Sequence, residues 1–220
     1  MAKAAPVKTN AALRDDSEHR ILDAAVKLFA AHGFKGASLQ MIAASADLPK
    51  ANLLYYFSTK QELYRRVIEH VFQIWEVAAE SFVGATDPVV AISGFIEQRM
   101  EIARSFPEGN QIWGSEVAGG AKQAGDYLDG VLDGRLRGHE AMIRDWVETG
   151  KLAPINPKNL LFMLFAIPHY YAAFSREIAS HNDGNPLSDR QWQDAKRDVI
   201  AIVLRGVLPS PPSHSPASDN

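Results

Sequence analysis

The 220-residue sequence predicts an all-α protein, with an N-terminal three-helix helix-turn-helix domain followed by a larger helical domain. Three observations support this class. Apolar residues recur three and four positions apart through successive segments, which is the period of an amphipathic helix. Several of these segments begin with serine, threonine, asparagine or aspartate, the residue types that cap helix N-termini. No segment alternates as a half-buried strand does, and no βαβ pattern occurs.

The N-terminal region contains two short helical patterns around a tight break. A first helix begins near Glu18 and ends at Gly33, a residue suited to a helix C-terminus. Ser38 can cap the second helix, which Asp47-Leu48-Pro49 ends because proline disfavours helix in the residue before it. The third helix is expected from about Pro49 to Tyr56. This arrangement is typical of a DNA-reading helix-turn-helix.

The later helices are predicted from caps, prolines and apolar stripes. Ser58 or Thr59 opens the fourth helix, with Gln61 and Glu62 placed as in a capping box. The fourth helix is expected to continue to about Phe82. Further helices are expected from Asp87-Pro88 to Phe106-Pro107, around Glu108–Val117 and from about Ala121 to Thr149. Asn156-Pro157 opens a helix from Leu160 through Ile178, and Ser188, with Gln191 three residues later, opens the last one, which extends to about Val207. The predicted division is a flexible arm (1–16), a helix-turn-helix domain (17–62), a larger helical domain (63–208) and a disordered tail (209–220).

Composition narrows the possible functions. The chain lacks cysteine, which excludes disulfides and thiolate metal sites. No segment resembles a signal peptide or is apolar enough to span a membrane, so a cytoplasmic location without membrane partners is expected. The net charge is -3, but residues 33–66 hold five basic and two acidic side chains. The basic groups are therefore concentrated where a DNA-binding face is expected.

The segment from Leu53 to Leu63 reads Leu-Leu-Tyr-Tyr-Phe-Ser-Thr-Lys-Gln-Glu-Leu and resembles the recognition-helix signature of the TetR family. Ile21-Leu22-Asp23-Ala24-Ala25, Gly33-Phe34-Lys35-Gly36 and Ile42-Ala43 extend the resemblance over residues 17–66. It implies a dimeric repressor whose larger domain binds a small effector and forms the dimer.

The second half of the chain resembles the regulators of pyrimidine utilisation in that family. The shared residues are Trp146-Val147, Gly150–Ile155, Phe162-Met163, and Tyr171-Ala172 with Phe174. The resemblance implies an indole and a carboxamide side chain where this sequence has Phe165 and His169, and Pro168 is a further departure. Recognition of uracil or thymine therefore does not follow for this chain. A pyrimidine or a similar planar, polar metabolite is the class that the resemblance implies.

Two sets of residues are candidates for DNA contact. Lys50, Ala51, Asn52 and Tyr55 lie where a recognition helix enters the major groove, and Asn52 can pair with adenine. Phosphate contacts are expected from Ser38, Tyr56 and Lys60. The alternative is an ordinary solvent-facing helix surface, which the surrounding motif disfavours. Core positions are expected at Leu53, Leu54 and Phe57.

Candidate ligand residues are aromatic or titratable groups on otherwise apolar helices, a mixture found around enclosed small-molecule sites. They are Trp75, Trp113, Glu116, Phe165, His169 and Tyr170. The alternative is that these side chains simply fill the core. Pro168 should kink its helix and free the carbonyl of Leu164, for a ligand or only as a structural bend.

These patterns predict a homodimeric DNA-binding regulator that releases its operator when it binds a small effector. The dimer is expected to form through the apolar stripes of the last helix and of Leu160–Ile178, which could instead pack within one monomer. A ligand carrier without DNA binding is the main alternative, and an enzyme using His169 and Glu116 as acid and base is a third possibility. No enzyme motif, cofactor or metal site is predicted, since Glu177 and His181 lack further ligands.

Overall fold

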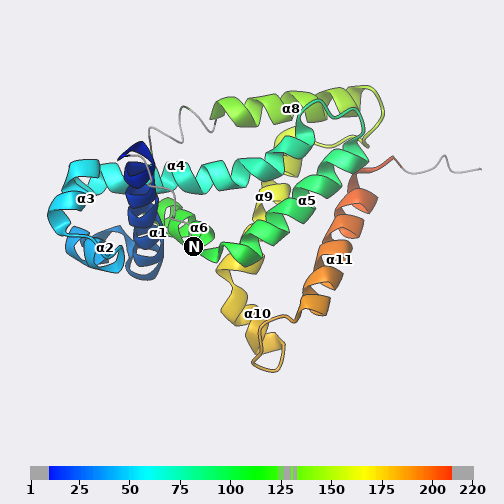
Figure 1. The fold of residues 1–220 in the computed structure, drawn as a ribbon. Helices are drawn as coiled ribbons and strands as arrows, with labels where there is room; N and C mark the ends of the chain where they lie inside the picture. The colour runs from blue at the N-terminus through cyan, green and yellow to red at the C-terminus, as the bar shows by residue number, and fades with distance from the viewer. Residues whose placement is uncertain (1–9, 124, 126–129, 131–132, 210–220) are drawn as a thin grey trace, which may run out of the picture. The chain divides into compact units, whose positions relative to one another are not determined.

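The computed structural model describes residues 10–123, 125, 130 and 133–209, and every regular element among them is a helix. The predicted all-α class is confirmed. The elements, labelled in Figure 1, are α1 (Asn10–Gly36), α2 (Leu39–Ser45), α3 (Lys50–Tyr56), α4 (Lys60–Ala79), the 3₁₀ helix η1 (Glu80–Phe82), α5 (Pro88–Ser105), α6 (Pro107–Ala118), α8 (Asp133–Glu148), α9 (Pro157–Ala173), α10 (Ser175–His181) and α11 (Asp189–Val207).

The chain forms two compact units. The first comprises the described parts of residues 1–73 together with Glu108–Gly125, and the second comprises Ile74–Pro107 and the described parts of residues 126–220. The first unit thus takes in more than the expected domain at 17–62, because the N-terminal part of α4 and nearly all of α6 belong to it.

Aromatic packing explains why α4 joins the first unit. The ring of Tyr64 on α4 meets the rings of Phe29 and Phe34 edge-on, with centroid distances of 4.8 and 5.0 Å. One turn apart on α4, Tyr64 and Ile68 are both buried. Burial of this apolar side provides the main stabilisation of a helix on its neighbours. Figure 1 shows α1, α2 and α3 as neighbours in this unit.

The core of the second unit is built around α5, which packs against both α9 and α11 (Figure 1). Phe82 of η1 meets Phe95 of α5 at 5.6 Å and Trp146 of α8 at 6.0 Å between ring centroids. Phe95 in turn meets Phe165 of α9 at 5.6 Å. These aromatic side chains belong to one buried cluster that the inner faces of α5, α8, α9 and α11 share.

The predicted caps are confirmed at four helices. The side chains of Ser38, Asp87 and Asn156 each accept a main-chain N–H in the first turn of the following helix. Ser188 and Gln191 form a complete capping box at α11. Side-chain acceptors at these positions satisfy donors that a helix N-terminus leaves unpaired, which explains why the sequence located the helix starts well.

Three predicted boundaries differ from the structure. Helix α1 already begins at Asn10, within the expected arm, where alanine and leucine favour helix without needing an apolar face; residues 1–9 lie outside the described part. Residues 121–123 are not helical, and Ala121 has a φ of 52°. The helix expected from Leu160 through Ile178 is two helices, because Phe174 leaves helical geometry at φ −109° and ψ 26°. The expected tail lies outside the described residues except at Pro209.

Pro168 does not end its helix. It is buried inside α9, which continues to Ala173, five residues beyond the proline. The position of the break at Phe174 shows that the local backbone there, and not the proline ring, ends this helical stretch.

Candidate DNA-binding surface and ligand site

The helix-turn-helix has a tightly hydrogen-bonded turn. The amide of Leu48 donates to the carbonyl of Ala43 at 3.0 Å, and the amide of Ala46 donates to that of Ile42 at 2.9 Å. Asp47 adopts a left-handed conformation with φ 54°, which aspartate tolerates better than most residues. This turn fixes the direction in which α3 leaves α2.

Arg20 of α1 holds this turn from outside. Its guanidinium donates to the main-chain carbonyl of Ala46 at 2.5 Å and to that of Asp47 at 3.3 Å. The same guanidinium lies 3.7 Å from the fully exposed carboxylate of Asp47. Carbonyls at a helix C-terminus lack intrahelical partners, so a cation there satisfies them. No sequence pattern marks Arg20, because its partners lie 26 and 27 positions away.

The exposed side of α3 carries the predicted base-reading residues. Lys50, Ala51, Asn52 and Tyr55 are all exposed, and 68% of Tyr55 is accessible. Tyr56, a predicted phosphate contact, is half-buried and meets the Tyr55 ring edge-on at 5.3 Å. The arrangement presents donors, acceptors and an aromatic ring on one short helix.

The opposite side of α3 holds it to the core. Leu53 is 0% exposed and Phe57 2% exposed, which confirms their predicted core positions. The prediction for Leu54 was wrong, since 41% of it is exposed. The reason is helical periodicity: positions four apart share one face, whereas the next residue is rotated by about 100°.

The other two predicted phosphate contacts already have partners within the unit. The Ser38 hydroxyl accepts the amide of Met41 at 3.1 Å, so it also serves as the N-cap of α2. Nζ of Lys60 lies 4.7 Å above the Phe34 ring and 3.4 Å from the carbonyl oxygen of Lys35. These contacts orient the lysine, whose side chain stays partly exposed.

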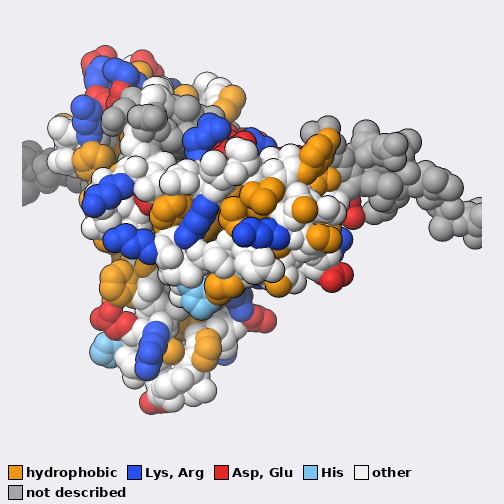
Figure 2. Space-filling view, turned by 90° about the vertical axis from the view of Figure 1, so that its left-hand side faces the viewer, with side chains coloured by type: hydrophobic (Ala, Val, Ile, Leu, Met, Phe, Trp, Pro, Cys, Tyr) orange, Lys and Arg blue, Asp and Glu red, His pale blue; other side chains and the backbone are white. Residues whose placement is uncertain are grey.

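The N-terminus of α4 lies three residues beyond α3 and has a reciprocal cap. The Thr59 hydroxyl accepts the amide of Glu62, whose carboxylate accepts both the amide and the hydroxyl of Ser58. The hydrogen bonds from Ser58 hold the pKa of Glu62 below its ordinary value. Figure 2 views the protein from the side on which α3 lies in Figure 1 and shows lysine and arginine side chains near the middle of that view.

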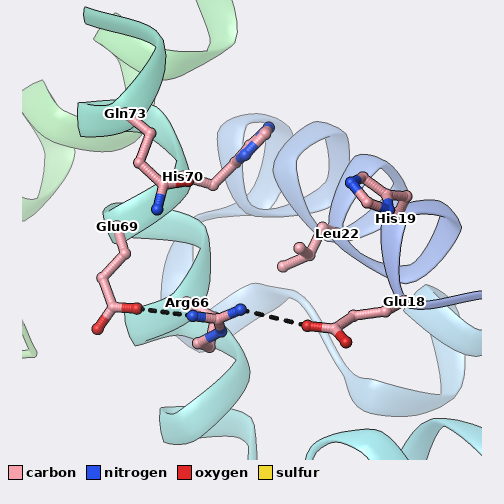
Figure 3. A pocket seen from close by; sticks show the side chains of 7 residues that line it. All are labelled: Glu18, His19, Leu22, Arg66, Glu69, His70 and Gln73. Atoms are coloured by element: carbon pink, nitrogen blue, oxygen red, sulfur yellow. Dashed lines mark hydrogen bonds and ion pairs between the residues drawn. The ribbon is translucent and has the colours of Figure 1, made fainter. Parts of the chain in front are cut away.

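A hollow of about 330 Å³ lies between α1 and α4 in the same unit. Its lining is polar, and Figure 3 shows Arg66 reaching between two carboxylates. The guanidinium lies 3.2 Å from Glu18 of α1 and 3.2 Å from Glu69 of α4. Burial lowers the pKa of His70, another lining residue. The arrangement ties α1 to α4 behind the helix-turn-helix.

Two of the six candidate ligand residues belong to the first unit. Trp113 on α6 meets Phe72 edge-on at 4.9 Å. The buried carboxylate of Glu116 accepts the hydroxyl of Tyr64 at 3.2 Å and the amide of Gln123 at 2.6 Å. Both residues therefore have packing or hydrogen-bonding roles inside this unit.

The other four candidates belong to the second unit. Trp75 is half-buried, and the guanidinium of Arg99 lies 4.5 Å from the centroid of its ring. Burial, together with the charge of Arg99, lowers the pKa of His169. Phe165 packs against Phe95. Tyr170 is 44% exposed and stacks on Phe174 at 4.9 Å, which places it on the outer side of α9.

Arg99 thus connects two of the predicted ligand residues, although the sequence patterns did not single it out. It is only 4% exposed, and burial lowers the pKa of its guanidinium to about 10. A basic residue among the apolar positions of α5 is the one sequence signal that could have drawn attention to it.

No group of three or more histidine or acidic side chains in the described part of the chain is placed to hold a metal ion. Glu177 and His181 lie on the short helix α10, where both are exposed. Within the same described residues, no helix is long and apolar enough to cross a membrane.

Two family models match the chain and together cover most of it. The model described as "Bacterial regulatory proteins, tetR family" matches residues 21–67. The model described as "YcdC-like protein, C-terminal region" matches residues 68–210.

Comparison with individual proteins also finds bacterial transcriptional regulators. The chain is 33% identical to the HTH-type transcriptional regulator RutR of Escherichia coli (strain K12), over 86% of this chain and 89% of that protein. It is also 33% identical to the HTH-type transcriptional repressor NicS of Pseudomonas putida, over 88% of this chain and 93% of NicS. Among solved structures, AibR in complex with isovaleryl coenzyme A and operator DNA matches with a TM-score of 0.68 and 18% identity, covering 84% of this chain and 97% of AibR.

Proposed function

The chain belongs to the TetR family of bacterial regulatory proteins, and from this membership we propose that it is a homodimeric repressor that a small molecule releases from its operator. It is a helix-turn-helix transcriptional regulator, as its relatives are. We assign DNA binding to residues 17–62, and effector binding and dimerisation to residues 63–208. The observation that carries the proposal is the exposed row of polar side chains on α3, which a buried leucine anchors to the core.

In this proposal, α3 enters the major groove. Asn52 hydrogen-bonds an adenine edge, Ala51 contacts a thymine methyl group, and Lys50 and Tyr55 reach neighbouring base edges or phosphates. Ser38, Tyr56 and Lys60 hold the phosphates on either side and fix the register without reading sequence. Their positions at the start of α2, the end of α3 and the start of α4 support this assignment.

Dimerisation is proposed through α9 and α11 of two copies. Large apolar side chains on these helices and just after α9 are exposed: Phe162 (58%), Met163 (52%), Tyr170 (44%), Phe174 (46%) and Ile202 (69%). A second copy related by a two-fold axis would cover them. The two recognition helices would then meet successive major grooves about 34 Å apart.

The effector is proposed to contact Trp75, Phe165, His169 and Tyr170 in the second unit, and Trp113 and Glu116 remain candidates in the first. Their aromatic character suits a planar, polar metabolite such as a pyrimidine. Binding favours a dimer whose recognition helices no longer match the half-site spacing, so operator affinity falls by the differential binding free energy. AibR provides a parallel, since its structure contains both isovaleryl coenzyme A and operator DNA.

We propose a non-catalytic role in the cytoplasm, where DNA is accessible. The relatives named above are transcriptional regulators, which favours this over acid–base chemistry at His169 and Glu116. We expect that the protein converts none of the candidate metabolites. Turnover of a metabolite that His169→Ala abolishes would refute the non-catalytic role.

The direct test is a gel shift with the DNA flanking the protein's own gene at several salt concentrations. Specific binding that weakens steeply as salt rises is expected, because phosphate contacts release counterions. A thermal-shift screen of nucleobases and related metabolites then searches for the effector. Binding of small molecules without any DNA binding would instead favour a ligand carrier.

A further inference from the structure

Arg99 is buried in the interior of the second unit, and one nitrogen of its guanidinium has no hydrogen-bonding partner among the described residues. Nη1 is shielded from solvent and forms no hydrogen bond with any residue that the structure describes. The guanidinium lies 4.5 Å from the centroid of the Trp75 ring, and its charge contributes to the lowered pKa of His169. A buried guanidinium stays charged and normally has an acceptor, so the missing partner needs an explanation.

Two other basic residues, one on α5 and one on α11, form ion pairs with carboxylates. Arg104, on the same helix as Arg99, lies 5.6 Å from the Trp192 ring and also forms an ion pair with Asp189. Lys196, the other buried cation in the described part of the chain, donates to Glu101 at 2.5 Å. Arg99 resembles Arg104 in its position over a tryptophan ring, but among the described residues no acidic side chain forms an ion pair with it.

The acidic residues nearest to Arg99 in sequence do not serve it. Glu97 and Glu101 are two positions before and after it, and such positions do not share a helix face. Both turn toward α11, where Lys196 lies 4.0 Å from Glu97 and 2.5 Å from Glu101. His169 cannot replace these carboxylates, because an imidazole is either neutral or positively charged. Glu97 and Glu101 are therefore paired with Lys196, and no described residue accepts a hydrogen bond from Nη1 of Arg99.

Aromatic side chains lie one helical turn before Arg99 on α5 and before His169 on α9. Phe95 and Arg99 are four apart on α5, and Phe165 and His169 are four apart on α9, so each pair shares a helix face. The two phenyl rings meet edge-on at 5.6 Å. Two facing helices thus present an aromatic pair beside a polar pair, and in the polar pair Nη1 of Arg99 has no acceptor among the described residues.

We propose that Arg99 binds the carboxylate of an aromatic acid, and that this acid is the effector. The planar fork of a guanidinium matches a carboxylate with two parallel hydrogen bonds, and its ring neighbours suit a planar apolar body. The inference rests on the proposed function and sharpens it, because it replaces a neutral pyrimidine by a ring that carries an acid. The ligand would supply an acceptor for Nη1 of Arg99, which no described residue provides.

The test compares acids with amides of the same shape: benzoate with benzamide, and orotate with orotamide. With the purified full chain, an acid is expected to raise the Tm while its amide leaves the Tm unchanged. Arg99→Met is expected to weaken acid binding about tenfold or more, the size of a lost charge-assisted hydrogen bond. Arg99→Lys should keep the preference for acids at reduced affinity, because it retains the charge and loses the fork.

Arg104→Met is the matched control, since it removes an arginine over a tryptophan ring from the same helix and should leave the acid response intact. Without ligand, Arg99→Met should have a higher Tm than the wild type, because an unmatched buried charge has been replaced by an apolar side chain. A lower Tm without ligand would overturn the proposal, since it would mean that Arg99 already has a partner. Equal responses to acid and amide, or no response to either acid, would also overturn it.

Operator binding by the wild type without any acid is measured separately. If the protein fails to bind DNA but responds to the acid through Arg99, the proposed function fails while the ligand assignment stands. If it binds DNA and ignores the acids, only the ligand assignment fails.

Discussion

The hydroxyl of Tyr64 on α4 donates a hydrogen bond of 3.2 Å to the carboxylate of Glu116 on α6. Both residues are buried, at 2% and 6% exposure, and 52 positions separate them in the sequence. The bond joins α4, the helix that follows α3, to a segment from the middle of the chain. Burial and the charge of Glu116 raise the pKa of Tyr64 well above its ordinary value, so the hydroxyl remains a donor at all physiological pH values.

Removal of this hydroxyl should destabilise the first unit. Tyr64→Phe retains the ring that packs on Phe29 and Phe34 but leaves a buried carboxylate with one donor fewer. We expect the free energy of unfolding to fall by about 1 to 3 kcal/mol, the range for a hydrogen bond to a charged group. Urea denaturation measures it. Tyr55→Phe, at an exposed position, is the control and should change stability little; an equal loss in both variants would contradict the assigned role.

The contact of Arg20 with the turn predicts an effect on both stability and DNA binding. Arg20→Met removes the donor to the carbonyls of Ala46 and Asp47, which end α2. The bond is partly exposed, so we expect a loss of about 1 kcal/mol in unfolding free energy. Operator affinity should fall as well, because the direction of α3 becomes less well fixed. Lys27→Met, an exposed position on α1, is the control, and wild-type operator affinity in Arg20→Met would exclude this role.

Substitutions at two adjacent residues of α3 should have separate effects, one on DNA recognition and the other on stability. Asn52→Ala is expected to lower specific operator affinity by about 1 to 3 kcal/mol and to relax the base preference at one position, with the Tm nearly unchanged. Leu53→Ala should instead cost about 2 to 5 kcal/mol of stability, because Leu53 is fully buried. Gel shifts on the operator and on a single-base variant measure the first effect, and denaturant unfolding the second. Equal affinity losses on both DNAs would make Asn52 a phosphate contact.

The parts of the fold that local chemistry determines were predictable from the sequence. Ser38 and Ser188 mark helix starts through hydrogen bonds that span three residues, and such short-range contacts are visible in a linear pattern. The break at Phe174 was missed because neither a proline nor a glycine stands there to mark it.

The parts of the candidate site that depend on distant segments were not predictable. Arg20 acts through carbonyls 26 and 27 positions away, and any arginine on the polar side of α1 would look the same in the sequence. The burial of Arg99 depends on how α5 packs against α9 and α11, which no local spacing reveals. Leu54 could have been placed correctly, since helical periodicity puts it off the face that Leu53 and Phe57 share.

Acidification should destabilise the protein through half-buried histidines, most clearly through His139 of α8. Burial lowers the pKa of His139, whose ring lies 5.2 Å from that of Phe82, and burial also lowers the pKa values of His70 and His169. A histidine with a lowered pKa in the folded state takes up its proton more readily when unfolded. Its contribution to stability is therefore fully present above the unfolded-state value of about 6.5 and is lost as the pH falls toward the lower folded-state value.

We expect the Tm to fall between pH 7.5 and pH 5.5, and the fall to be smaller in His139→Gln, which has no group to protonate. Differential scanning calorimetry at the two pH values measures both shifts. His181→Gln, at an exposed position on α10, is the control and should show the wild-type fall. A Tm that rises on acidification, or an unchanged fall in His139→Gln, would show that carboxylates and not this histidine set the pH dependence.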